Sequence, residues 1–115
     1  MSAFAGYAAL FDRVDRAGDV FRAGAFADAT SVPLLRNHRG PPIGAVTVRE
    51  DGRGLKVEGA ADVVRLGDGL SVGFRATRVR HGARRELLGV RLVEVSLVAM
   101  PMQPGARVET IFNEE

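Results

Sequence analysis

The chain of 115 residues contains no cysteine and no tryptophan. The missing cysteines exclude disulfides, thiolate metal ligands and a cysteine nucleophile, and they fit a reducing compartment such as the cytoplasm. No apolar run approaches the roughly 20 residues of a membrane span. The opening residues also lack the basic start and the long apolar stretch of a signal peptide. We therefore expect an intracellular protein with no membrane partner.

Lysine is almost absent, because Lys56 is the single lysine among the 16 basic residues and all the others are arginines. The net charge is only +2, but arginines cluster between residues 75 and 91, where Glu86 is the one acid. A solvated hairpin explains this cluster better than an acidic or nucleic-acid partner. No aromatic residues interleave with these arginines for base stacking, so we expect no specific nucleic-acid partner.

Histidine is scarce, with only His38 and His81 in the chain. Two histidines so far apart in sequence form no familiar metal-ligand motif. We therefore predict neither a metal ion nor a cofactor.

Hydrophobic residues at 46% and charged residues at 26% are ordinary values for one globular domain, which we place over residues 1–115. Period-two alternation of apolar residues predicts strands over 32–38, 43–50, 54–63, 70–80 and 87–100. A short helix is expected within residues 20–30, capped by Asp19 and weakened by Gly24. The predicted fold is mainly β (α+β), a small antiparallel β-barrel with one or two short helices.

A serine within the strand-like stretch GLSVGF stands out as a candidate nucleophile. Alternation places Ser71 on the face opposite Leu70 and Val72, and it places Glu94 on the face opposite Val93 and Val95. Ser71 and Glu94 are therefore expected to look outward and to meet across adjacent strands. A serine hydroxyl needs a base, usually a histidine that a carboxylate orients.

The residue types alone leave simpler readings open. Ser71 is small enough to suit close packing, and Glu94 suits an exposed strand position beside an arginine. His38 suits a strand end, and His81 suits the exposed tip of a turn.

Four blocks of sequence resemble the prohead proteases of tailed phages. They are GYAALF with DRAGDVFRAGAFA, VPLLRNHRGPPIGAV, GLSVGFR, and LVEVSLVAMPMQPGARV, in this order from about Gly6 to about Val108. The resemblance implies a serine endopeptidase that cleaves the scaffold segment from the major capsid protein during prohead maturation. It also implies a compact β-barrel related to the herpesvirus assemblin proteases.

The resemblance further assigns the catalytic positions, with His38 as the base and Ser71 as the nucleophile. Glu94 is the expected third member, and His81 competes with it because the assemblin relatives use a second histidine. Arg75 is a candidate for the oxyanion hole. The expected location is the host cytoplasm, inside assembling proheads, and the resemblance leaves self-cleavage and homo-oligomer formation open.

Two departures from the family pattern leave an alternative open, although the presence of both the histidine and the serine favours an active enzyme. First, family members carry a longer and often helical stretch between the strand that includes Leu55 and the serine block, but here only VVRLGDG separates them. Second, Arg39 stands after the histidine in place of the usual acid. The alternative is a catalytically inactive capsid-assembly or scaffold-associated protein on the same fold. The compact form suits a small phage or a phage-derived gene transfer agent.

Overall fold

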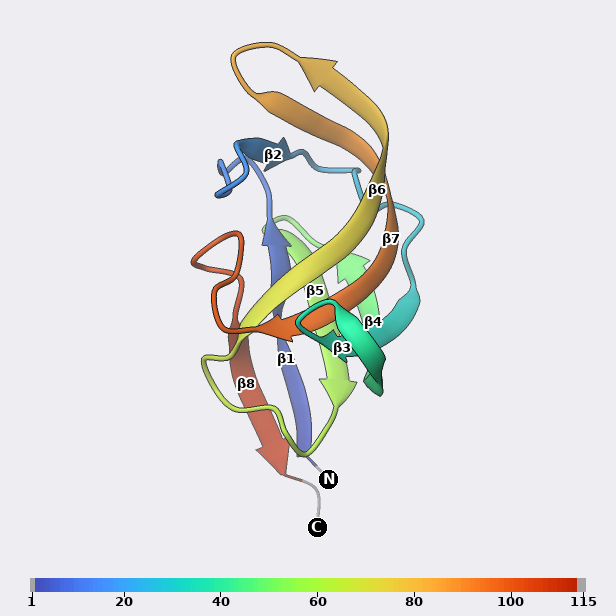
Figure 1. The fold of residues 1–115 in the computed structure, drawn as a ribbon, viewed down its shortest axis with the longest axis vertical. Coiled ribbons are helices and arrows are strands. Elements are labelled where there is room, and N and C mark those ends of the chain that lie inside the picture. The colour runs from blue at the N-terminus through green and yellow to red at the C-terminus, as the bar shows by residue number, and fades with distance from the viewer. Residues whose placement is uncertain (1, 114–115) are drawn as a thin grey trace.

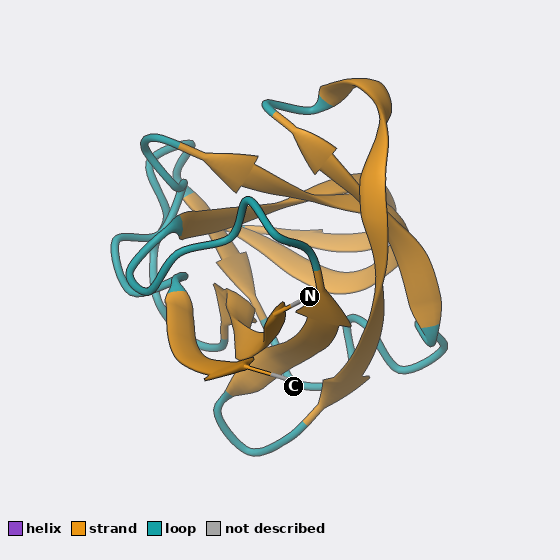
Figure 2. Ribbon diagram, turned by 90° about the horizontal axis from the view of Figure 1, so that it is seen from below, coloured by secondary structure: helices purple, strands orange, loops and turns teal. Residues whose placement is uncertain are grey.

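A computed structural model describes residues 2–113. Stretches in which apolar residues recur with a period near two form most of its strands. The strands are β1 (Ser2–Leu10), β2 (Asp19–Phe21), β3 (Ser31–Arg36), β4 (Arg39–Glu50), β5 (Gly54–Ala60), β6 (Gly69–His81), β7 (Arg85–Val98) and β8 (Val108–Asn113) (Figure 1). The described residues form no helix, as the ribbon coloured by secondary structure also shows (Figure 2). The mainly β prediction is therefore confirmed.

All eight strands join one mixed sheet in which β7 is the central strand. One edge of β7 pairs with β6 along an antiparallel hairpin. Its other edge pairs in parallel with β2 near the start of β7 and with β3 near its end. From β3 the sheet continues antiparallel through β4, β5 and β1 to β8. The sheet is mainly antiparallel, and the predicted antiparallel barrel was wrong at these two parallel pairings.

The sheet curls strongly but does not close into the predicted barrel (Figure 2). Strands β6 and β8 approach each other only where an isolated bridge joins Gly69 to Arg107 and the Leu70 N–H donates to the Ala106 carbonyl, 2.9 Å away. Beyond Leu70, β6 turns away with β7 as a long hairpin. A barrel needs continuous pairing around its circumference, and this divergence prevents it.

The predicted helix within residues 20–30 is absent, and this segment instead forms β2 followed by tight turns. Gly24 has a φ of +94°, which is outside the right-handed helical region. The Glu50 carboxylate accepts the backbone N–H groups of Gly24 and Phe26, at 2.8 and 2.7 Å. Asp19 caps no helix, because its buried carboxylate pairs with both Nε and Nη2 of Arg85.

The core lies inside the curl, where apolar side chains from most strands meet. Leu55 and Val57 are fully buried, as the alternation in β5 predicted. Phe21 packs between Phe26 and Phe74, with ring centroids 5.0 and 5.2 Å apart. The other large, fully buried side chains include Phe4, Leu10, Leu34, Val46, Leu70, Leu87, Val95 and Val108.

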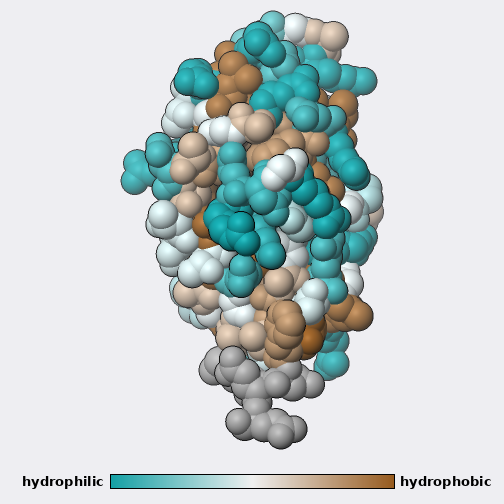
Figure 3. Space-filling model, turned by 180° about the vertical axis from the view of Figure 1, so that it is seen from behind, coloured by the Kyte–Doolittle hydropathy of each residue, from teal (hydrophilic) through white to brown (hydrophobic). Residues whose placement is uncertain are grey.

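The long hairpin of β6 and β7 makes the molecule elongated, with extents of 49 × 28 × 23 Å (Figure 1). The face opposite that of Figure 1 is hydrophilic over much of its middle and more hydrophobic toward the end near the termini (Figure 3). The described residues contain no helix long and apolar enough to cross a membrane.

Candidate active site

Strand β7 brings the candidate residues together because it lies between β3 and β6. Ser96 of β7 pairs with Leu35 of β3 on one side and with Ser71 of β6 on the other. Glu94, two residues earlier on the same face of β7, lies opposite Gly73. Directly opposite residues of an antiparallel pair project from the same face. Ser71, Glu94 and Ser96 therefore share one face of the sheet.

His38 reaches this face through a tight turn between β3 and β4. Arg36 pairs with Arg39, which leaves Asn37 and His38 as a two-residue hairpin loop. Both have positive φ, 53° and 61°, as a type I′ turn requires. Such a conformation is uncommon for histidine and persists only when its surroundings hold it. The predicted strand end at His38 is thus a hairpin turn, and Pro41 and Pro42 lie within β4 instead of interrupting the strand.

Glu94 and Ser96 hold His38 by both its backbone and its ring. His38 Nδ1 lies 2.5 Å from Glu94 Oε1. The Ser96 hydroxyl donates to Glu94 Oε2 at 2.6 Å and accepts the His38 backbone N–H at 2.9 Å. A carboxylate only accepts hydrogen bonds, so Nδ1 carries the hydrogen and Nε2 is left to accept a proton.

The candidate carboxylate and nucleophile are buried, contrary to the expectation that they look outward. Ser71 is 5% exposed, Glu94 6% and Ser96 0%, whereas the His38 side chain is 43% exposed. Burial strengthens the electrostatic interaction between an imidazole and its carboxylate partner. The imidazole thus joins a buried carboxylate to a surface that solvent and ligands can reach.

Ser71 lies on the strand next to this hydrogen-bonded group but is not part of it. Among residues 2–113, its hydroxyl makes no hydrogen bond to His38 or to any other group. The structure therefore brings His38 and Glu94 into direct contact and leaves Ser71 adjacent to them. Catalytic hydrogen bonds are often long before substrate binds.

Gly73 gives the Glu94 carboxylate the space that it occupies. A Cβ atom at position 73 would lie 2.1 Å from Glu94 Oε1, far inside van der Waals contact. A β-bulge follows, because Gly73 pairs with Glu94 while Phe74 pairs with Leu92. The extra residue, Val93, is exposed instead of facing the core as alternation predicted. Bulges often redirect side chains beside active sites.

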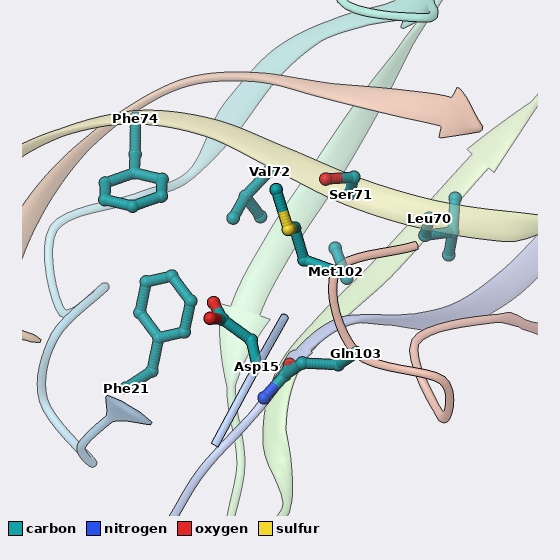
Figure 4. Close-up of a pocket in the computed structure, with 9 residues that line it drawn as sticks. Asp15, Phe21, Leu70, Ser71, Val72, Phe74, Met102 and Gln103 are labelled. Atoms are coloured by element: carbon teal, nitrogen blue, oxygen red, sulfur yellow. The ribbon is translucent and has the colours of Figure 1, made fainter. Parts of the chain in front are cut away.

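A cavity adjoins Ser71 at the edge of β6 that β7 does not pair (Figure 4). Asp15 and Gln103 lie across this cavity from β6. The Gln103 amide is fixed by hydrogen bonds to the backbone N–H and carbonyl of Leu10, at 2.7 and 2.9 Å. The full lining is Ala8, Asp15, Phe21, Leu70, Ser71, Val72, Phe74, Met102 and Gln103. A largely apolar cavity beside a serine can accept a small side chain of a bound ligand.

The two remaining candidates lie away from this group. His81 ends β6 at the exposed tip of the hairpin, ten residues beyond Ser71. Arg75 is exposed, four residues beyond Ser71. Within residues 2–113, no group of three or more His, Asp or Glu side chains could hold a metal ion.

The sequence did not lead us to Ser96, nor to the role of Gly73 in leaving space for the Glu94 carboxylate. Ser96 stands two residues after Glu94, so alternation in a strand already placed both on one face. That spacing was the available signal. The contact with His38 had no such signal, because it depends on the parallel pairing of β3 with β7.

Comparison with known proteins gives one match. A family model described as caudovirus prohead serine protease matches residues 1–115. Neither the curated proteins nor the solved structures contain a match to this chain.

Proposed function

The chain belongs to the caudovirus prohead serine protease family, and on this basis we propose that it is a serine endopeptidase that removes the scaffold segment from the major capsid protein. The observation that carries the proposal is the 2.5 Å contact between His38 Nδ1 and Glu94 Oε1, on the strand next to Ser71. This contact supports an imidazole that is oriented for proton transfer at Nε2.

In the proposed mechanism Ser71 Oγ attacks the carbonyl carbon of the scissile peptide bond while His38 Nε2 takes its proton. Glu94 fixes the ring through Nδ1–H and stabilises the imidazolium. The imidazolium then protonates the leaving amine, which releases one fragment and leaves an acyl ester on Ser71. Water activated by the same imidazole hydrolyses this ester and restores the serine.

The hydrogen bond between Ser71 and His38 forms when substrate occupies the site. The proposed mechanism needs this bond at Nε2, which the contact of Nδ1 with Glu94 leaves free.

Glu94 is a better third member than His81. The His38 ring contacts Glu94 directly, whereas His81 lies at the hairpin tip. The alternative of a catalytically inactive assembly protein fits this hydrogen-bonded group less well. Glu94 orients the His38 ring through Nδ1, and Ser96 contacts both residues, which is the arrangement that proton transfer at Nε2 needs.

The proposed partner is the major capsid protein with its scaffold segment, and the proposed place of action is the interior of assembling proheads in the host cell. Co-expression with the capsid protein of the same gene cluster tests the proposal, with intact-mass analysis of that capsid protein as the readout. We expect loss of an N-terminal segment with the wild type, and an uncut capsid protein with Ser71→Ala or His38→Ala.

Matched controls are Ser31→Ala and His81→Ala, because both side chains are exposed and lie outside the proposed site. Both controls should cut normally. An uncut capsid protein with the wild type, in shells that still assemble, would favour the structural alternative. Loss of cutting in His81→Ala, with normal cutting in Ser31→Ala, would favour His81 over Glu94 as the third member.

A further inference from the structure

Two arginines lie directly opposite each other on the face of the hairpin that also carries Ser71. Arg75 of β6 pairs with Arg91 of β7 across the antiparallel ladder, and both are exposed. Like charges at directly opposed positions repel each other and disfavour strand pairing. This pair therefore weakens the hairpin locally.

No carboxylate within residues 2–113 neutralises this pair, since neither Arg75 nor Arg91 makes an ion pair or a hydrogen bond through its side chain. Other arginines of the same hairpin are neutralised, because Arg80 pairs with Glu86 and Arg85 with Asp19. The two opposed guanidinium groups are free to bind an anion.

A surface hollow lies beside the pair, along the same hairpin as the candidate site. It is lined by Arg75, Arg91, Leu92 and Val93, and Val93 is the bulge residue that precedes Glu94. Val93 is 47% exposed, so the hollow combines two cations with an uncovered apolar side chain. A peptide side chain with an apolar stem and an acidic end matches this composition.

The position along β6 relates the pair to the scissile bond. Ser71, Gly73 and Arg75 alternate on one face, and four residues of strand span about 13 Å. An extended peptide rises by the same amount per residue. A peptide bound at Ser71 and lying along β6 therefore brings a residue about four positions from the scissile bond over Arg75 and Arg91.

We propose that Arg75 and Arg91 form a subsite for an acidic side chain of the substrate, three to five residues from the cleaved bond. This rests on the proposed endopeptidase function. A carboxylate there would form charge-assisted hydrogen bonds with both guanidinium groups and remove their mutual repulsion. The subsite would thus fix the position of the peptide on the enzyme.

A protein segment suits the surface better than nucleic acid does. The nearest aromatic ring, Phe74, packs edge-on against Phe21 and is not available to stack on a base. Single-stranded nucleic acid binding generally combines a basic track with exposed aromatic side chains.

The test starts from the cleavage site, once intact-mass analysis has mapped it. Two twelve-residue peptides spanning the cleaved bond serve as probes, one natural and one with the Asp and Glu residues three to five positions from the bond changed to amides. The enzymes are the wild type, the double variant Arg75→Gln/Arg91→Gln, and the control Arg78→Gln/Arg84→Gln. The control arginines belong to the same hairpin and are also exposed without an ion pair.

We expect the Arg75→Gln/Arg91→Gln variant to lower kcat/KM for the natural peptide about tenfold, as the loss of hydrogen bonds to a charged group predicts. The amide peptide should be cut slowly by every enzyme, and the control variant should stay within about twofold of the wild type. Reversal to Arg75→Glu/Arg91→Glu should restore cutting of a peptide whose acids are changed to lysine. That gain also rules out simple misfolding of the charge variants.

Two results would overturn the subsite. The first is equal cutting of the natural peptide by the wild type and the Arg75→Gln/Arg91→Gln variant, which leaves the proposed function intact. If that variant has also lost binding of a fluorescent single-stranded oligonucleotide, the pair is assigned to nucleic acid. The second is a mapped cleavage site with no acidic residue within five positions. A wild type that cuts nothing contradicts the proposed function itself, and the subsite falls with it.

Discussion

Gly73 and His38 show how much the backbone contributes to the candidate site. His38 has a φ of 61°, and Ser96 and Glu94 hold it there through its N–H and its ring. Gly73 lies under the Glu94 carboxylate, where any Cβ atom would collide with Oε1. Ser96 and Gly73, which take no part in the proposed chemistry, thus help Glu94 to set the position of the imidazole.

Gly73→Ala should therefore remove activity while the protein stays folded. The new Cβ would displace Glu94 Oε1, which lies 2.1 Å from its position, and so break the contact with His38. Small misplacements of catalytic groups can lower rates on the order of 10²-fold. The measurement is the rate of capsid-protein cleavage, together with thermal unfolding to confirm folding.

Gly82→Ala is the matched control, because a Cβ at Gly82 in the same hairpin would meet nothing within 4 Å. It should cut at the wild-type rate. Equal activity in both variants would show that Glu94 is not needed where the structure has it.

At the residue scale, the sequence predicted the residue types of the site better than their environment. Alternation placed Ser71 and Glu94 on one face correctly. It did not predict their burial, nor the exposure of Val93, because a bulge leaves no mark on an apolar alternation. The catalytic roles of His38, Ser71 and Glu94 remain predictions from the family resemblance.

At the scale of elements, ion pairs attach the tip of the long hairpin to its neighbours. Glu86 of β7 accepts hydrogen bonds from Arg80 of β6 and from Arg22, which follows β2. The Arg80 and Arg22 guanidinium groups lower the pKa of Glu86 from 4.5 to about 2. The charged form of Glu86 is therefore favoured in the folded protein.

This lowered pKa predicts a stability difference that depends on pH. A carboxylate whose pKa falls on folding stabilises the fold above its unfolded pKa, and the stabilisation disappears as pH falls through the folded pKa. Glu86→Gln should lower the urea midpoint at pH 7, and its difference from the wild type should shrink between pH 4.5 and about 2. Glu58→Gln, at an exposed position of β5 without an ion pair, should match the wild type throughout. A Glu86→Gln deficit that does not change with pH would contradict this account.

Strands were easier to predict than the helix because local alternation specifies a strand directly. Leu55 and Val57 alternate with Lys56 and Glu58, and this segment forms β5 as expected. The segment after Asp19 has helix-compatible residues, but two distant side chains stabilise a different conformation. The Glu50 carboxylate accepts the Gly24 N–H, and the Arg85 guanidinium binds Asp19. Such long-range contacts are not visible in a local pattern.

At the scale of the whole molecule, the mixed pairing of β7 is what assembles the site. Its parallel pairing with β3 places His38 beside Glu94, and its antiparallel pairing with β6 places Ser71 on the neighbouring strand. The connection between β5 and β6, residues 61–68, contains turns and no helix. The curl stays open on the side where β6 leaves β8, and the cavity beside Ser71 lies at that edge of β6. The sequence led us to expect the pairing of β6 with β7, but the parallel pairing of β3 with β7 did not follow from it, since strand order depends on the whole chain.

The most direct test of the account asks whether Ser71 is an activated nucleophile. Proheads assembled by co-expression would be treated with a fluorophosphonate, from which an activated serine Oγ displaces fluoride, and the adduct would be located by peptide mass analysis. The account predicts one adduct on Ser71 in the wild type, none in Ser71→Ala, and little in His38→Ala, because the base is missing. An unlabelled Ser71 in proheads whose capsid protein has been cut, or equal labelling of Ser71 in His38→Ala, would contradict it.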